Sequence, residues 1–259
     1  MKKNDGIQAG VSYPGRRKRL IALALSKQEE VLNAMKNRRV VVVAGTTNAY
    51  LAEELLLLIG ESDFDIHGFF RGIIRREAIP GNLSRVKGDV VIDHGVWQKG
   101  VTIHDVGDTL REGDLIFKGA NAVNLQTGEA AVLAGNPTSG TMGVIYRAVV
   151  GRRVKLITPV GVEKRVYEPI SRLCLLCNSQ DAVGERLAPS FGTVFTELDA
   201  IRSLTGCEPH LVAGGGVCGC EGGAFFQCLG NAEQLSSLRE WIALANREPM
   251  FSFSAYQHP

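Results

Sequence analysis

The residues that follow the first strongly apolar run of the chain have the types and spacing of an anion-binding turn. In RRVVVVAGTTNAYLAEELL, residues 38–56, a run of valines leads to Gly45, Thr46, Thr47 and Asn48, and a helical pattern follows at once. Free N–H groups at the start of a helix, together with hydroxyl groups, bind phosphate and carboxylate groups. The same residues also suit a tight turn in which Thr47 or Asn48 caps the helix, so the motif leaves both interpretations open.

Further glycine-containing turns could converge on the same site. They are Gly119-Ala120-Asn121, Gly140-Thr141-Met142-Gly143 and Pro159-Val160-Gly161. Open α/β sheets bind ligands at the carboxyl edge of their strands, where such turns meet. Gly119, Asn121, Gly140 and Thr141 are therefore ligand-binding candidates. Lys118 could pair there with a phosphate or carboxylate, or it could be a strand-end lysine that extends into solvent.

Carboxylates that could act as a base or a nucleophile are sparse around these turns. Glu129, in LQTGEAAVLAG, is the first candidate, and Asp93 beside His94 is the second. Glu129 and Glu221 lie among glycines and small residues, which suits a glutamate nucleophile, although surface or structural roles are commoner. Because adjacent residues of a strand point to opposite faces, we expect no dyad from Asp93 and His94.

Four of the six cysteines form close pairs, Cys174 with Cys177 and Cys218 with Cys220. Four thiolates can hold a zinc ion. However, RLCLLCNS is apolar and helix-like, and GVCGCEGG lacks the turn of a zinc knuckle, so we expect no metal and thiols that pack as small apolar groups. The glycine-rich segment 213–223 lacks the Lys-Ser/Thr of a phosphate-binding loop, and a tight hairpin is the simpler interpretation.

Short apolar strands and helices alternate along the first part of the chain, and they must position these turns. This order predicts an α/β fold with a mostly parallel, Rossmann-like sheet flanked by helices. We expect helices at 16–36, 50–59, 139–153 and, with an interruption at Pro169, 162–179; the expected strands are 40–43, 69–74, 88–95, 114–117 and 154–161.

The pattern changes after a loop at 178–192. A strand, a short helix, two strands around the glycine-rich segment and a helix that begins after Asn231 give the order βαββα. This order is similar to a small ferredoxin-like α+β layer. We therefore expect two parts, an α/β ligand-binding domain over 1–190 and a small α+β subdomain over 191–259.

The segments AGTTNAYLAEEL, IFKGANAVN and SGTMG…VKLITPVGVEK occur in an order that resembles a known superfamily. It contains ribose-5-phosphate isomerase, glucosamine-6-phosphate deaminase, the CoA transferases and DeoR-type sugar-phosphate sensors, and the resemblance covers roughly residues 38–165. It implies that Gly45, Thr46 and Thr47 cradle a phosphate or a similar anion.

The chain departs from the isomerase where that enzyme has carboxylates that assist proton transfer. The matching positions here are Lys118, Asn121 and Asn124. An amide has no protonation equilibrium near neutral pH and cannot act as a general base, although Asn121 could hydrogen-bond a ligand hydroxyl. Isomerase-like or CoA transferase-like chemistry with Glu129 and Lys118 as catalytic residues is one hypothesis, and a sensing module without catalysis is the other.

Composition sets the class of protein and its partners. The net charge of +2 gives no basic field for nucleic acid, and the basic run GRRKRL at 15–20 suits the exposed start of a helix. No apolar run is long enough to span a bilayer, and the apolar stretch at 20–25 is short for a signal peptide. We expect a cytoplasmic homo-oligomer that binds a small anionic ligand, with no nucleic-acid or membrane partner and no cofactor except coenzyme A in the transferase case.

Overall fold

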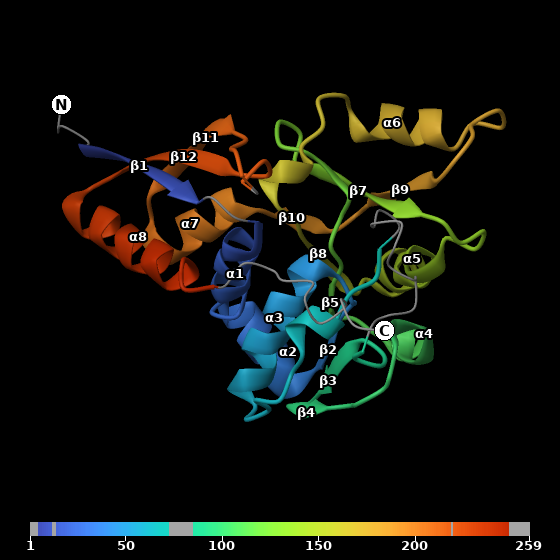
Figure 1. The fold of residues 1–259 in the computed structure, drawn as a ribbon. Coiled ribbons are helices and arrows are strands. Elements are labelled where there is room, and N and C mark those ends of the chain that lie inside the picture. Colours follow the sequence, from blue (N-terminus) through green and yellow to red (C-terminus); the bar gives the residue numbers. More distant parts are fainter. Residues whose placement is uncertain (1–4, 12–13, 73–84, 219, 249–259) are drawn as a thin grey trace.

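The computed structural model describes residues 5–11, 14–72, 85–218 and 220–248. Its centre is a six-stranded sheet in the order β10-β8-β5-β2-β3-β4 (Figure 1). The strands are β10 (Thr193–Phe195), β8 (Lys155–Pro159), β5 (Leu115–Phe117), β2 (Arg39–Val42), β3 (Val90–Asp93) and β4 (Val96–Trp97). The first four are parallel, whereas β3 and β4 each pair antiparallel with their neighbour. The prediction of an α/β fold with a mostly parallel sheet is confirmed.

Helices cover both faces of this sheet. Val40 and Val42 of β2 pack in a core with α1 (Pro14–Leu25), α2 (Glu29–Asn37) and α3 (Thr46–Leu58). Val41 and Val43 face the opposite way and pack with α4 (Ile103–Val106) and α5 (Gly140–Arg152). A strand that is buried on both faces needs apolar residues at every position, which explains the unbroken valine run.

Several helix predictions need correction. The helix predicted over 16–36 is two helices, α1 and α2, separated at Ser26, whose hydroxyl donates to the Leu23 carbonyl and competes with helix continuation. Helix α3 begins at Thr46, four residues before the predicted start at Tyr50. After β8, only the 3₁₀ turn η3 (Val162–Lys164) forms before Pro169, and α6 (Ile170–Cys177) follows that proline.

The strand predicted over 69–74 is wrong for the part that the structure describes. The 3₁₀ turn η1 (Ile66–Gly68) precedes it, and residues 69–72 form no strand. Positions 73 and 74 lie outside the described residues. The glycine at position 72 already weakened this pattern, since glycine in a strand interior gives it little to pack.

Two small antiparallel sheets flank the central one. One of them is covered by α6 and consists of β6 (Ala122–Asn124), β7 (Glu129–Ala134) and β9 (Arg186–Ser190). This sheet was not predicted from the sequence. On the other side, β1 (Asp5–Val11), β12 (Ala224–Gly230) and β11 (Glu208–Gly214) form a sheet beside α7 (Glu197–Thr205) and α8 (Ala232–Ala245) (Figure 1).

The predicted βαββα order is present as β10, α7, β11, β12 and α8. Its first strand, however, pairs with β8 and belongs to the central sheet. The place of a third strand beside β12 is taken by β1, from the other end of the chain. The 3₁₀ turn η2 (Gly107–Thr109) directly follows α4.

Candidate anion-binding site

The first turn of α3 lies at the carboxyl end of β2, and no side chain caps its backbone N–H groups. Gly45 is the N-cap residue, and no side chain bonds to the cap. The Thr47 hydroxyl is buried without a hydrogen-bond partner among the described residues. The interpretation of Thr47 or Asn48 as the helix cap is therefore wrong. The first N–H groups of an α-helix have no partner within the helix, so this turn offers donors to a ligand.

Asn48 instead holds two strand ends together. Its side-chain amide donates to the Val43 carbonyl at 2.8 Å and to the Phe117 carbonyl at 3.0 Å, and the residue is buried. These contacts fix the start of α3 beside the ends of β2 and β5. Asn48 therefore positions the site, and its amide hydrogens are already used.

Three lysines from separate elements surround this edge of the sheet: Lys18 of α1, Lys118 directly after β5, and Lys164 of η3. The Lys18 ammonium donates to the Thr46 hydroxyl at 3.3 Å, and the Lys164 ammonium donates to the Ala120 carbonyl at 2.6 Å. The Lys118 ammonium has no hydrogen-bond or ion-pair partner among the described residues. Of these three lysines, only Lys118 was considered as a ligand-binding residue from the sequence.

Burial lowers the pKa of all three lysines. Loss of solvation brings the pKa of Lys18 to about 8 and that of Lys118 to about 8, and it also lowers the pKa of Lys164. The charge of Lys164 contributes to the lowered pKa of both Lys18 and Lys118. Lys164 is thus the electrostatic neighbour of both other lysines, and a bound anion would relieve this repulsion.

The carboxylate whose charge acts on Lys118 already has other partners. Asp89 is fully buried, and its carboxylate accepts from the backbone N–H groups of Ala44 at 2.9 Å and Ile103 at 2.7 Å. The Arg71 guanidinium forms an ion pair with it at 3.1 Å. Asp89 therefore holds the turn before α3 in place and raises the pKa of Lys118 only through space.

A buried ion cluster lies beside the lysines. Arg17 is completely buried and lies 3.4 Å from a Glu163 oxygen and 3.7 Å from a Glu197 oxygen, and it also donates to the Gly222 carbonyl. Glu197 accepts from the Val162 N–H at 2.9 Å. Burial and the nearby Glu163 raise the pKa of Glu197. The cluster connects α1, η3, α7 and the turn between β11 and β12.

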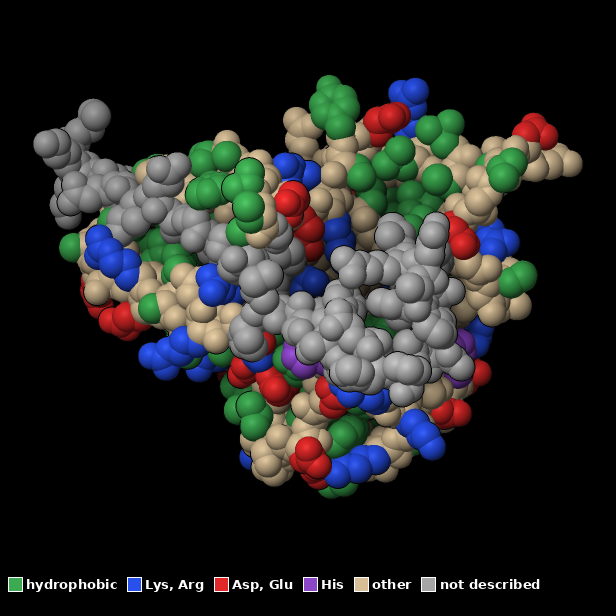
Figure 2. Space-filling model, in the orientation of Figure 1, with side chains coloured by type: hydrophobic (Ala, Val, Ile, Leu, Met, Phe, Trp, Pro, Cys, Tyr) green, Lys and Arg blue, Asp and Glu red, His purple; other side chains and the backbone are tan. Residues whose placement is uncertain are grey.

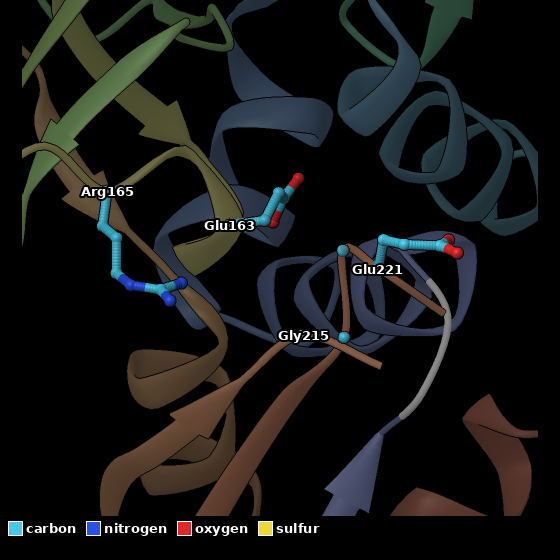
Figure 3. A pocket seen from close by; sticks show the side chains of 6 residues that line it. Glu163, Arg165, Gly215 and Glu221 are labelled. Atoms are coloured by element: carbon cyan, nitrogen blue, oxygen red, sulfur yellow. The ribbon is translucent and has the colours of Figure 1, made fainter. Parts of the chain in front are cut away.

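A cavity of about 270 Å³ adjoins this cluster. Glu163, Arg165 and Glu221 line it together with Gly215, Gly222 and Gly223 of the turn between β11 and β12 (Figure 3). Gly215 has φ +104°, and a Cβ on Gly223 would lie 2.6 Å from the Gly215 carbonyl oxygen. Glycine is therefore required by the backbone of this turn, as the hairpin interpretation predicted. Glu163 joins the cavity to the lysines, because its charge raises the pKa of Lys18 and Lys164.

Charges of both signs share the face shown in Figure 2, where basic and acidic side chains lie together in the recess between the β11–β12 sheet and α6. The recess is therefore not a uniformly basic surface. At this edge the positive charge comes from individual lysines and the N–H groups at the end of a helix, and not from a broad positive field.

Other predicted residues lie elsewhere or have structural partners. Glu129 is exposed at the start of β7 and accepts from the Thr127 hydroxyl at 2.7 Å, so the structure does not bring it to the lysines. The Asn121 side-chain oxygen accepts from the Leu133 N–H at 3.0 Å and closes the β6–β7 hairpin. Gly140 and Thr141 begin α5 after Ser139, whose side chain makes no cap hydrogen bond. A Cβ on Gly119 would lie 3.6 Å from the Pro159 carbonyl oxygen at the end of β8.

Asp93 and His94 interact, against the expectation from strand geometry. The His94 Nδ1 atom lies 2.6 Å from an Asp93 oxygen. His94 has φ +48°, so it is outside the extended strand and its side chain turns back. Asp93 also pairs with Arg39 at the beginning of β2, which is the opposite end of that strand from Thr46.

All six cysteines are free thiols. Cys174 is buried on α6, and burial raises the pKa of its thiol. Within the described ranges, no group of three or more His, Cys, Asp or Glu side chains is arranged to hold a metal ion. No described helix has the length and apolar character to cross a bilayer.

Comparisons with protein-family models, with curated proteins and with solved structures find no match to this chain. Sequence reasoning missed Arg17, Lys18 and Lys164. The basic run GRRKRL was interpreted as the exposed start of a helix, and the Glu-Lys pair after Pro159-Val160-Gly161 was placed at the start of the helix predicted over 162–179.

Proposed function

We propose that this chain binds a small phosphorylated or carboxylated metabolite at the carboxyl edge of its central sheet. The observation that carries the proposal is the contact of Lys18 with the uncapped first turn of α3, together with Lys118 and Lys164, which follow the neighbouring strands β5 and β8. Cations and helix N–H groups that lose water without gaining a carboxylate partner are stabilised by an anion. The proposed location is the cytoplasm.

The family-level part of the proposal rests on the resemblance of the GTT, GAN and GTMG segments to the isomerase and CoA transferase superfamily. In that case the central sheet is Rossmann-like, and the β1-β12-β11 sheet with α7 and α8 is the ferredoxin-like layer. Burial lowers the pKa of Lys18 and Lys118 to about 8, which is compatible with an enzyme as well as with a sensing module. Glu129, exposed on its hairpin, gives the enzyme hypothesis little further support.

A thermal-shift screen against sugar phosphates, nucleotides, CoA esters, inorganic phosphate and small carboxylates tests the proposal. A ligand at about 100 times its Kd stabilises the protein by about 2.7 kcal/mol. We expect at least one class to raise Tm, and we expect Thr46→Ala/Thr47→Ala to abolish this rise. Thr127→Ala, which removes a hydroxyl on the exposed β6–β7 hairpin, is the matched control. A rise in Tm that survives the double substitution would place the ligand elsewhere.

A further inference from the structure

We propose that the Lys118 amine forms an imine with a bound aldehyde or ketone that carries a phosphate or carboxylate group. The inference rests on the proposed anion site and names its substrate class. The α3 turn and Lys18 would hold the anionic group, and Lys118 would attack the carbonyl carbon of the same molecule.

Lys118 lies in the right place for this role. It follows β5, and β5 lies between β2, which leads to α3, and β8, which leads to Lys164. The Asn48 amide of the first α3 turn bonds to the carbonyl of Phe117, the residue directly before Lys118. Neighbouring strands are about 4.8 Å apart, so one small molecule can span from the α3 turn to the Lys118 side of the edge.

Lys118 also differs from its two neighbours in being available. The Lys18 ammonium is engaged with Thr46, and the Lys164 ammonium is engaged with Ala120. Lys118 is half-buried and has no hydrogen-bond or ion-pair partner among the described residues, because Asp89 already accepts from two N–H groups and pairs with Arg71. A lysine desolvated beside another cation is the usual setting of an amine nucleophile.

The protonation state is compatible with attack at neutral pH. Burial and the charges of Arg71 and Lys164 lower the pKa of Lys118 to about 8. At pH 7 about a tenth of such an amine is neutral, compared with about one part in 2,500 for an ordinary lysine. The nucleophilic form is thus about 250 times more abundant than on an exposed lysine.

The chemistry balances without an oxidant. The amine nitrogen adds to the carbonyl carbon, the carbonyl oxygen leaves as water, and a carbon–nitrogen double bond remains. The protonated imine withdraws electrons from the neighbouring carbon. Added cyanoborohydride supplies a hydride to the imine carbon and converts the adduct to a stable secondary amine, which makes the attachment site visible by mass spectrometry.

The test is reductive trapping on the full chain with glyceraldehyde 3-phosphate, with pyruvate as the carboxylate arm and glyceraldehyde as the uncharged control. Peptide mapping compares Lys118 with the exposed Lys99 and Lys155. We expect at least about tenfold enrichment of label at Lys118 with an anionic carbonyl compound, because the neutral amine is about 250 times more abundant there than on an exposed lysine. Inorganic phosphate should reduce this enrichment, and glyceraldehyde should not produce it.

Lys118→Arg separates the two proposals, because arginine keeps the charge but cannot form this adduct. Trapping should be lost in Lys118→Arg and retained in Lys99→Arg. Stabilisation of the wild-type protein by glycerol 3-phosphate, which has the anion but no carbonyl, tests the anion site separately. If wild-type protein is stabilised by glycerol 3-phosphate but its label is spread evenly over exposed lysines, the imine is excluded and the anion site stands. If neither stabilisation nor enrichment occurs, both proposals fail.

Discussion

At the scale of single residues, the carboxyl edge holds several ionisable groups whose charge is disfavoured by burial. Burial lowers the pKa of Lys18 and Lys118 and raises that of Glu197, so each shift favours the neutral form. A group that loses solvation without a full set of partners lowers the stability of the fold. Such residues are typical of sites where stability is given up for binding or catalysis.

Replacement of Lys118 by methionine should therefore stabilise the protein at pH 7. Methionine fills similar space without a charge. Removal of the buried charge, whose loss of solvation lowers the pKa of Lys118, should raise the free energy of unfolding by about 1–3 kcal/mol. Folded Lys118 has a pKa of about 8, compared with 10.5 for an ordinary lysine. Between these values the unfolded chain binds more protons, so wild-type stability rises with pH and the advantage of the variant shrinks.

Urea unfolding of wild type and Lys118→Met at pH 7 and pH 9.5 measures this difference. Lys99→Met, at an exposed lysine, is the matched control and should change little at either pH. A Lys118→Met variant less stable than wild type at pH 7 would show that the charge of Lys118 is compensated in the folded protein.

The sequence predicted some of these residues and could not predict others. A hydroxyl pair directly after a buried strand is a local signal, and Thr46 and Thr47 were found by it. Arg17 carries no such signal, because it lies in a basic run typical of an exposed helix start. Its complete burial depends on Glu163, Glu197 and Gly222, which come from three distant segments.

At the scale of elements, apolar runs located the strands but not their directions. Val90–Asp93 has the same continuous apolar pattern as the parallel strands, yet it runs antiparallel to β2. Direction depends on the connection between β2 and β3 and not on the residues within the strand. The β6–β7 hairpin was missed because AVN and EAAVLA are rich in small residues with weak strand preference.

Asn48 joins three elements, and the contribution of its hydrogen bonds to stability can be measured. Its amide donates to carbonyls at the ends of β2 and β5 while its backbone belongs to α3. Asn48→Ala removes two hydrogen bonds. The Phe117 carbonyl keeps the Val43 N–H as a donor at 2.9 Å, whereas the Val43 carbonyl loses the Asn48 amide, so we expect a loss of about 1–3 kcal/mol in the free energy of unfolding. Urea denaturation measures the loss.

Asn37→Ala is the control for Asn48→Ala, because the Asn37 amide bonds to Asn33 on an exposed surface of α2. It should change stability by no more than about 0.5 kcal/mol. Equal effects of the two substitutions would show that the Asn48 hydrogen bonds contribute nothing particular to the junction.

At the scale of the whole molecule, one apolar core joins the central sheet to the β1-β12-β11 sheet. The cluster contains Leu20 of α1, Val40 of β2 and Phe117 of β5 together with Phe226 of β12 and Leu238 of α8. Helix α1 packs against α3 on one side and against α7 and α8 on the other. The candidate site lies at this junction, since Arg17 and Lys18 belong to the same helix.

A shared core predicts that the two sheets unfold together. The two tryptophans report on them separately, because Trp97 belongs to β4 of the central sheet and Trp241 to α8 beside the small sheet. Trp97→Phe leaves only the α8 reporter, and Trp241→Phe leaves only the β4 reporter. In urea, tryptophan fluorescence and far-ultraviolet circular dichroism should give the same midpoint within each variant. A fluorescence midpoint that precedes the circular dichroism midpoint in Trp97→Phe alone would mean that the small sheet opens first. In that case α1 would not couple the two sheets, and the site at their junction would lose Arg17 and Lys18 before the central sheet unfolds.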